Sequence, residues 1–139
     1  MTETVSIIVT DNYGKILLLK RSPHKKWYPE EWDIISGKLK NGESPKECFR
    51  RELFEETGIN HYKLMENKKP YIYQEEKRQW LVHPYHCVVK QNVVQLDGEH
   101  NVYKWVALSK LSDLNITKPA KLELKTFYGL RKMGSGLAF

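Results

Sequence analysis

The sequence has few of the features that mark secreted, membrane-spanning or zinc-binding proteins. Its two cysteines, Cys48 and Cys87, lie far apart and form no CxxC pair, so we expect neither a disulfide framework nor a zinc cluster. No apolar run approaches the roughly 18 residues that span a bilayer, and the start at Met1 lacks the pattern of a signal peptide. Repeats, low-complexity stretches and Pro/Gly/Ser-rich linkers are missing as well. The 139 residues therefore predict one cytoplasmic domain.

The charge is positive overall but unevenly distributed. With 23 basic and 17 acidic side chains the net charge is +6, which favours an anionic partner such as nucleic acid, a membrane surface or a phosphorylated small molecule. The segment 43–58 has the opposite sign, because its acidic residues outnumber its basic ones. Those acidic residues are Glu43, Glu47, Glu52, Glu55 and Glu56. An acidic patch within a basic background is the feature that a function has to explain.

Local patterns predict an α/β (α+β) domain with strands on both sides of a helix. A turn at 11–14 joins two strand-like runs, and a short apolar run at 32–35 follows a basic and aromatic loop. The predicted strands are 5–9, 15–20, 70–73, 80–89 and 103–108, and the predicted helices are 45–57 and 120–131. We place the domain at 1–133 and expect a flexible tail at 134–139.

The helix at 45–57 has the clearest end signals in the chain. Ser44 is its predicted N-cap, Pro45 occupies the first helical position, and Glu47 completes a capping box. Gly58 follows the last helical residue and is the expected C-terminal stop. These signals predict both ends of the helix.

Three carboxylates share one face of this helix. At about 100° per residue, Glu52, Glu55 and Glu56 fall within one arc of its surface. Like charges at such spacings destabilise a helix by about 0.2–0.5 kcal/mol per pair. Either this face is solvated and relieved by Arg50 and Arg51, or it binds a divalent cation that prefers oxygen ligands, Mg²⁺ or Mn²⁺.

The spacing of these residues resembles the signature of a known enzyme family. The sequence reads Gly37-x5-Glu43-x7-Arg51-Glu52-Leu53-x-Glu55-Glu56-x-Gly58-Ile59, which is similar at every defined position to the Nudix box of the MutT-like Nudix hydrolases. The resemblance implies an α/β/α sandwich with a mixed sheet and a loop-helix catalytic motif. One departure precedes the box, where Ile35-Ser36 occupies the places that usually hold Pro-Gly.

The resemblance also implies roles for the box residues. Arg51 resembles the structural arginine of the family, which holds carboxylates such as Glu43 in place. Gly37 and Gly58 resemble the positions where the backbone turns into and out of the helix. The implied cofactor is Mg²⁺, with Mn²⁺ as the alternative. The implied metal ligands are Glu52, Glu56, Glu55 and the main-chain carbonyl of Ser36.

The base that activates water is left open between helix carboxylates and a downstream residue. Glu52 and Glu55 are the candidates on the helix. Glu99-His100, followed by Tyr103-x-Trp105, resembles a pattern from which several branches of the family draw a loop carboxylate, so Glu99 is the third candidate. The same pattern, with Ser36 before the box, resembles the dihydroneopterin triphosphate pyrophosphatase branch.

Basic and aromatic residues lie near the expected mouth of the site. Arg21 and Lys38 are candidates for binding substrate phosphates as charge-assisted partners. The candidates for stacking on a flat base or pterin are Trp27, Tyr28, Trp80 and Tyr85. Solubilising charge and core packing are the alternative roles for these residues.

Together these features predict Mg²⁺-dependent hydrolysis of a pyrophosphate bond in a nucleoside triphosphate or similar (X-diphosphate) substrate, giving a monophosphate and pyrophosphate. Dihydroneopterin triphosphate and the 5′ end of an RNA are alternative substrates, so nucleic acid enters only as a substrate end. A non-catalytic nucleotide- or RNA-binding Nudix module and a basic nucleic-acid-binding domain are alternatives of another class. We expect a small-molecule polyphosphate partner and no membrane partner, and the sequence leaves a homodimer open.

Overall fold

The computed structural model describes residues 1–90, 94–96 and 100–129. Glu99 and the tail at 134–139 lie outside the described residues. In chain order the elements are β1 (Thr2–Thr10), β2 (Ile16–Arg21), β3 (Trp32–Asp33), β4 (Ile35–Lys38), α1 (Pro45–Thr57), β5 (Lys63–Asn67), β6 (Tyr71–Glu75), β7 (Arg78–Val88), β8 (His100–Val106), a 3-10 helix (Leu108–Asp113) and α2 (Lys118–Tyr128).

The strands form one mixed sheet. β1 and β7 run parallel, from Thr2 opposite Trp80 to Thr10 opposite Val88, and the other strand pairs are antiparallel. β1 pairs with β2 only where Thr10 meets Ile16, next to the predicted turn, and β4 then takes over the same edge of β1. β5 and β6 both pair with β7. The mixed sheet that the sequence resemblance implied is therefore confirmed.

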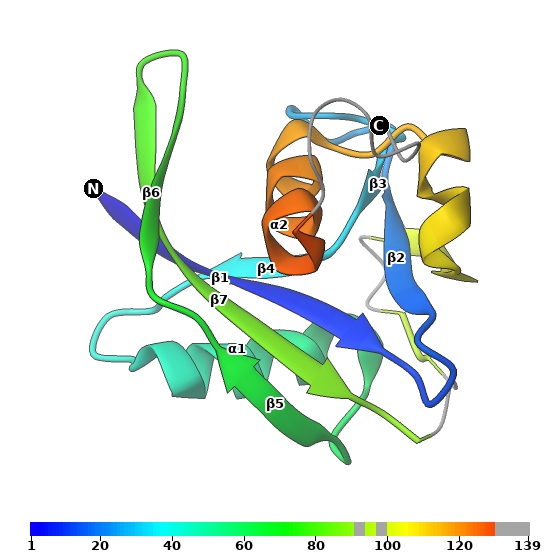
Figure 1. Cartoon of the computed structure of the whole chain (residues 1–139). Helices are drawn as coiled ribbons and strands as arrows, with labels where there is room; N and C mark the ends of the chain where they lie inside the picture. Colours follow the sequence, from blue (N-terminus) through cyan, green and yellow to red (C-terminus); the bar gives the residue numbers. More distant parts are fainter. Residues whose placement is uncertain (91–93, 97–99, 130–139) are drawn as a thin grey trace.

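The two helices cover opposite faces of this sheet (Figure 1). Because side chains alternate along a strand, Ile7 of β1 packs in a buried cluster with Phe49 of α1, whereas its neighbour Ile8 packs in a second cluster with Leu124 of α2. β2 divides in the same way, with Leu17 facing the first cluster and Leu18 the second. The result is the expected α/β/α sandwich with a core on each side of the sheet.

Most boundaries of the predicted elements lie within about two residues of the prediction, and β1 and β8 begin three residues earlier than expected. The helix at 45–57 is confirmed residue for residue as α1. α2 begins at Lys118 rather than 120, because the Thr117 side chain accepts a hydrogen bond from the Ala120 N–H and Pro119 fits the first turn. β3, β4, β5 and the 3-10 helix were not among the predicted elements, although β3 begins in the apolar run at 32–35. Within the described part of the chain, every helix is too short or too polar to cross a membrane.

Candidate functional site

The ends of α1 fix the position of its carboxylates. Ser44 Oγ accepts a hydrogen bond from the Glu47 N–H at 3.1 Å, and the Glu47 side chain accepts one from the Ser44 N–H at 3.2 Å. At the other end Gly58 adopts the left-handed conformation, with φ of 73°, and its N–H donates to the Phe54 carbonyl at 2.8 Å. The helix therefore starts and stops where these short-range contacts place it.

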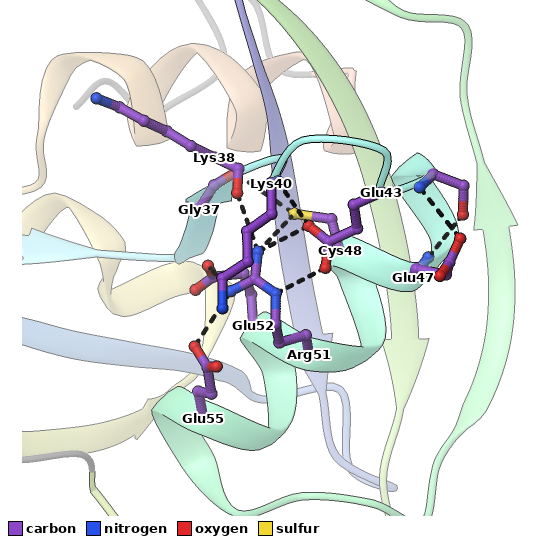
Figure 2. Close-up of polar contacts among 10 residues, drawn as sticks. Gly37, Lys38, Lys40, Glu43, Glu47, Cys48, Arg51, Glu52 and Glu55 are labelled. Carbon is purple, nitrogen blue, oxygen red and sulfur yellow. Dashed lines mark hydrogen bonds and ion pairs between the residues drawn. The ribbon is translucent and has the colours of Figure 1, made fainter.

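Arg51 is the centre of a polar network on α1 (Figure 2). Its guanidinium makes a bidentate contact with Glu43, from Nε at 2.7 Å and Nη2 at 2.8 Å. Nη1 lies 2.7 Å from Glu52 Oε1 and 3.2 Å from Glu55 Oε2, and Nη2 donates to the Lys38 carbonyl at 3.0 Å. One arginine thus joins the loop before the helix to two of the three clustered carboxylates.

The pKa values of the pair reflect this contact. Hydrogen bonds from Arg51, joined by one from the Lys40 N–H, lower the pKa of Glu43 to about 2. The same contact with Glu43, together with Glu52, raises the pKa of Arg51 above its already high ordinary value. Both groups are therefore charged at neutral pH, and the network is held by charge-assisted hydrogen bonds.

Gly37 makes room for the Glu52 carboxyl. A Cβ atom at Gly37 would overlap the Glu52 carboxyl carbon. Since Gly37 lies in β4 and is not among the residues with positive φ, its importance here is steric. Gly58 alone of these two fits the turning role that the resemblance implied.

The donor set suits Mg²⁺ or Mn²⁺, although Arg51 competes for it. Glu52, Glu55 and Glu56 line the same cavity as Ser36, and Glu56 is only 7% exposed. Carboxylate and carbonyl oxygens are the ligands that these ions prefer. Among the described residues, no three His, Cys, Asp or Glu side chains converge as a ready metal cluster. Arg51 contacts Glu52 and Glu55, so a cation would have to share those side chains with Arg51.

The cavity has a volume of about 980 Å³, near the upper end of the range for small-molecule sites. Its wall joins the carboxylates of α1 to a basic group and an aromatic group. The basic lining includes Arg21, Lys25, Lys38, Lys40 and Arg78, and the aromatic lining includes Trp27, Tyr28, Tyr71, Tyr73 and Trp80. The structure therefore brings together most of the residues that the sequence marked as candidates.

The two predicted phosphate-binding residues, Lys38 and Arg21, both line the cavity but differ in their contacts. Lys38 extends away from the Arg51 network in Figure 2, although its carbonyl belongs to that network. Arg21 is already engaged, because its Nη1 lies 3.1 Å from Asp33 Oδ2 and its Nε donates to the Trp27 carbonyl at 2.9 Å. Arg21 therefore fixes the loop that carries Trp27 more directly than it offers charge to a phosphate.

Tyr85 lies elsewhere than expected. It is 7% exposed and belongs to the core cluster under α1, where its ring stacks on Phe49 with centroids 4.7 Å apart. It does not line the large cavity. The expected stacking of Tyr85 on a substrate is corrected accordingly, whereas the other candidates Trp27, Tyr28 and Trp80 line the cavity.

Apart from Trp80, sequence reasoning missed the cavity residues that β6 and β7 contribute. Tyr71, Tyr73 and Glu75 line the cavity, as does Arg78 across the hairpin. The signal was available in β6, where these three residues alternate with Ile72 and Gln74, and residues two apart in a strand share a face. Two tyrosines and a glutamate on the same face of β6 are therefore the sequence pattern that could have indicated a binding surface.

Comparison with known proteins identifies one family. The family model described as NUDIX domain matches residues 2–127. The chain is 31% identical to an octanoyltransferase of Myxococcus xanthus, covering 93% of this chain and 34% of that protein. It is also 31% identical to a putative 8-oxo-dGTP diphosphatase of Bacillus subtilis, covering 79% of this chain and 69% of that protein. The chain spans about a third of the length of several curated relatives that it matches.

A solved structure agrees with this result. The crystal structure of a MutT protein from Methanosarcina mazei Go1 superposes with a TM-score of 0.77 at 25% identity, covering 92% of each chain. The similarity extends over the sheet and both helices rather than over the carboxylate helix alone.

Proposed function

The chain belongs to the NUDIX domain family, and from that premise we propose that it is a divalent-metal-dependent pyrophosphohydrolase. Its proposed substrate is a nucleoside triphosphate or a similar triphosphate, which it splits into a monophosphate and pyrophosphate. One observation carries the proposal: Glu52, Glu55 and Glu56 line a single cavity together with basic and aromatic side chains. Such a cavity offers ligands for a cation, charge for phosphates and faces for a flat ring.

The carboxylates supply what the reaction needs. Held by Glu52, Glu56 and Glu55 with the Ser36 carbonyl, Mg²⁺ or Mn²⁺ would neutralise phosphate oxygens and lower the pKa of the attacking water. Water gives its hydroxyl to one phosphorus, the bridging P–O bond breaks, and the bridge oxygen leaves with the other phosphate. A carboxylate must accept the proton that the water loses.

Glu55 is our candidate for the group that accepts this proton. Its side chain is 51% exposed, so it can reach water and pass the proton on to solvent. Glu52 is less suitable, because it is 13% exposed and is held by Arg51 at 2.7 Å. Glu99 stays a prediction from the sequence, since it lies outside the described residues.

Arg51 and Glu43 act as positioning residues in this proposal. Arg51 orients Glu52 and Glu55, and Glu43 fixes Arg51 by its bidentate contact. Lys38 is proposed to bind a substrate phosphate and Trp27 to stack on the substrate's flat group, because both line the cavity.

A substrate panel with Mg²⁺ or Mn²⁺ tests the proposal. The panel contains the common nucleoside triphosphates, dihydroneopterin triphosphate, dinucleoside polyphosphates and 5′-triphosphorylated RNA, with EDTA as the control. We expect at least one member to yield a monophosphate-ended product and pyrophosphate, and EDTA to abolish the reaction. If every member stays intact, the enzyme proposal fails and a non-catalytic binding module becomes the better account.

A further inference from the structure

A second carboxylate site lies in the cavity, in the hairpin formed by β6 and β7. This hairpin rises away from α1 (Figure 1), and Glu75 is the last residue of β6. The Glu75 Oε1 atom accepts hydrogen bonds from the hydroxyls of Tyr28 and Tyr73, the latter at 2.5 Å. All three side chains line the cavity. Glu75 is therefore held rigidly at a place where a substrate can reach it.

Glu75 is a hydrogen-bond acceptor at neutral pH. Burial pushes its pKa upward, but the hydrogen bonds from Tyr28 and Tyr73, with the charges of Lys118 and Arg78 nearby, outweigh burial and lower the pKa. Burial and the contact with Glu75 raise the pKa of Tyr28 to about 12, so its hydroxyl remains a donor. A carboxylate has about four acceptor positions, and the two tyrosines use both of those on Oε1, so the positions on Oε2 remain. Glu75 can accept further hydrogen bonds from a ligand.

Two indole rings beside Glu75 already bind a planar group. The Arg78 guanidinium carbon lies 3.5 Å from the centroid of the Trp27 ring and 4.7 Å from that of Trp80. Arg78 Nε is buried, and within the described residues it has no hydrogen-bond acceptor. Arg78 also lines the cavity, so the other N–H groups of its guanidinium can donate to an acceptor oxygen of a ligand that stacks beside it.

We propose that Glu75 determines the substrate of this site by accepting hydrogen bonds from adjacent N–H groups of a flat ring that stacks on Trp27 or Trp80. This inference rests on the proposed function and names the substrate class: a triphosphate whose head carries a 2-amino-4-oxo-pyrimidine edge, as guanine and pterins do. That edge presents a ring N–H and an amino group side by side to Glu75, with a carbonyl oxygen next to them for Arg78.

The other bases match this arrangement less well. Adenine and cytosine place a ring-nitrogen lone pair beside their amino group, which faces a carboxylate unfavourably. Uracil offers one N–H between two carbonyl oxygens. Since a polar site left unpaired or repelled discriminates strongly against the wrong ligand, a fixed Glu75 favours guanine over these three.

Steady-state kinetics with GTP, ATP, CTP, UTP and dihydroneopterin triphosphate test the inference. We expect the wild-type kcat/KM for GTP or the pterin to exceed that for ATP by at least about tenfold. Glu75→Gln retains an acceptor for the tyrosines but presents a neutral amide, and it should lower kcat/KM for the preferred substrate by about 10- to 100-fold, mainly through KM. The matched control is Glu76→Gln, which removes one charge from an exposed neighbour and should leave the preference unchanged.

A binding measurement separates this inference from the proposed function. In EDTA, titration of tryptophan fluorescence with GMP and with AMP should show tighter binding of GMP by the wild type and the loss of that difference in Glu75→Gln. Equal binding of both nucleotides, or hydrolysis of all four nucleoside triphosphates at similar kcat/KM, would overturn the inference while leaving the hydrolase intact. Selective GMP binding without hydrolysis of any triphosphate would support the recognition of the ring by Glu75 and overturn the proposed activity.

Discussion

Arg51 holds the carboxylate of its own neighbour in the sequence, with Nη1 2.7 Å from Glu52 Oε1. Adjacent residues on a helix normally point in different directions, so this contact needs the guanidinium to be fixed from outside the helix. The bidentate bond to Glu43 provides that, because it turns the arginine toward the loop before α1. The position of Glu52 therefore depends on a planar fork at residue 51.

Arg51→Lys tests this dependence. Lysine keeps the charge but cannot form the bidentate contact, so we expect the free energy of unfolding to fall by about 1–2 kcal/mol. Arg50→Lys is the matched control, because Arg50 is exposed on the same helix and should change stability by less than about 0.5 kcal/mol. Urea denaturation of both variants measures the difference. Equal stability of Arg51→Lys and Arg50→Lys would contradict the proposed role of the Arg51 guanidinium.

Gly37→Ala tests the space that Glu52 occupies. The added methyl group would displace the Glu52 carboxyl, and a displacement of this kind should lower turnover by about 100-fold while circular dichroism shows a retained fold. Ser36→Ala serves as the control, since the proposed ligand at that position is a main-chain carbonyl that alanine also provides. Near-wild-type activity of Gly37→Ala would mean that turnover does not depend on the position of the Glu52 carboxyl.

The lowered pKa of Glu43 predicts a pH-dependent stability. With a pKa of about 2 in the folded protein and an ordinary value of 4.5, Glu43 stabilises the fold above pH 4.5 and loses that contribution as the pH falls toward 2. Glu43→Gln cannot titrate, so the stability difference between wild type and variant should be largest near neutral pH and shrink over this window. A difference that stays constant between pH 6 and pH 2 would contradict the charged contact with Arg51.

Both cysteines should be unreactive in the folded protein. Cys48 and Cys87 are fully buried, and burial raises the pKa of each thiol to about 12. Because the thiolate is the reactive form, we expect labelling by a thiol reagent at pH 8 to be at least about 100-fold slower than in urea-unfolded protein. Rapid labelling of either thiol in the native state would contradict the burial of Cys48 on α1 and of Cys87 on β7.

The part of the fold that the sequence predicts best is the part that short-range contacts determine. The ends of α1 follow from Pro45 in the first turn and from Ser44 and Gly58, whose hydrogen-bond partners Glu47 and Phe54 lie three and four residues away. The shared face of Glu52 and Glu56 follows from helix geometry and holds in the structure. For this reason the carboxylate helix could be read from a single sequence.

Long-range pairing accounts for what was missed. β5 has the sequence Lys-Leu-Met-Glu-Asn, which lacks β-branched residues, and its partner is β7, some twenty residues later in the chain. The bond between Tyr28 and Glu75 joins a loop to a strand that is 47 residues away. From the sequence, Tyr85 could equally be an aromatic residue that binds substrate or one that packs in the core. Its stacking on Phe49 in the structure assigns it to the core. Such contacts between distant residues form only when the whole sheet is assembled, so a local sequence pattern does not predict them.

The proposed reactive site is formed by the carboxylates of α1, and Glu56 is the most buried of them. Glu56→Gln preserves the size of the side chain but removes the charge, so a metal site should be lost without unfolding. We expect Mg²⁺-dependent turnover to fall by about 1,000-fold or more relative to the wild type. Glu76→Gln, an exposed carboxylate of the β6–β7 hairpin, should retain wild-type turnover.

The most direct test is therefore the initial rate of pyrophosphate release by wild type and Glu56→Gln, side by side on the best substrate of the panel, with circular dichroism of both proteins. We expect the variant to fold like the wild type and to release almost no pyrophosphate. A folded Glu56→Gln protein that releases pyrophosphate at the wild-type rate would contradict the proposed reactive site.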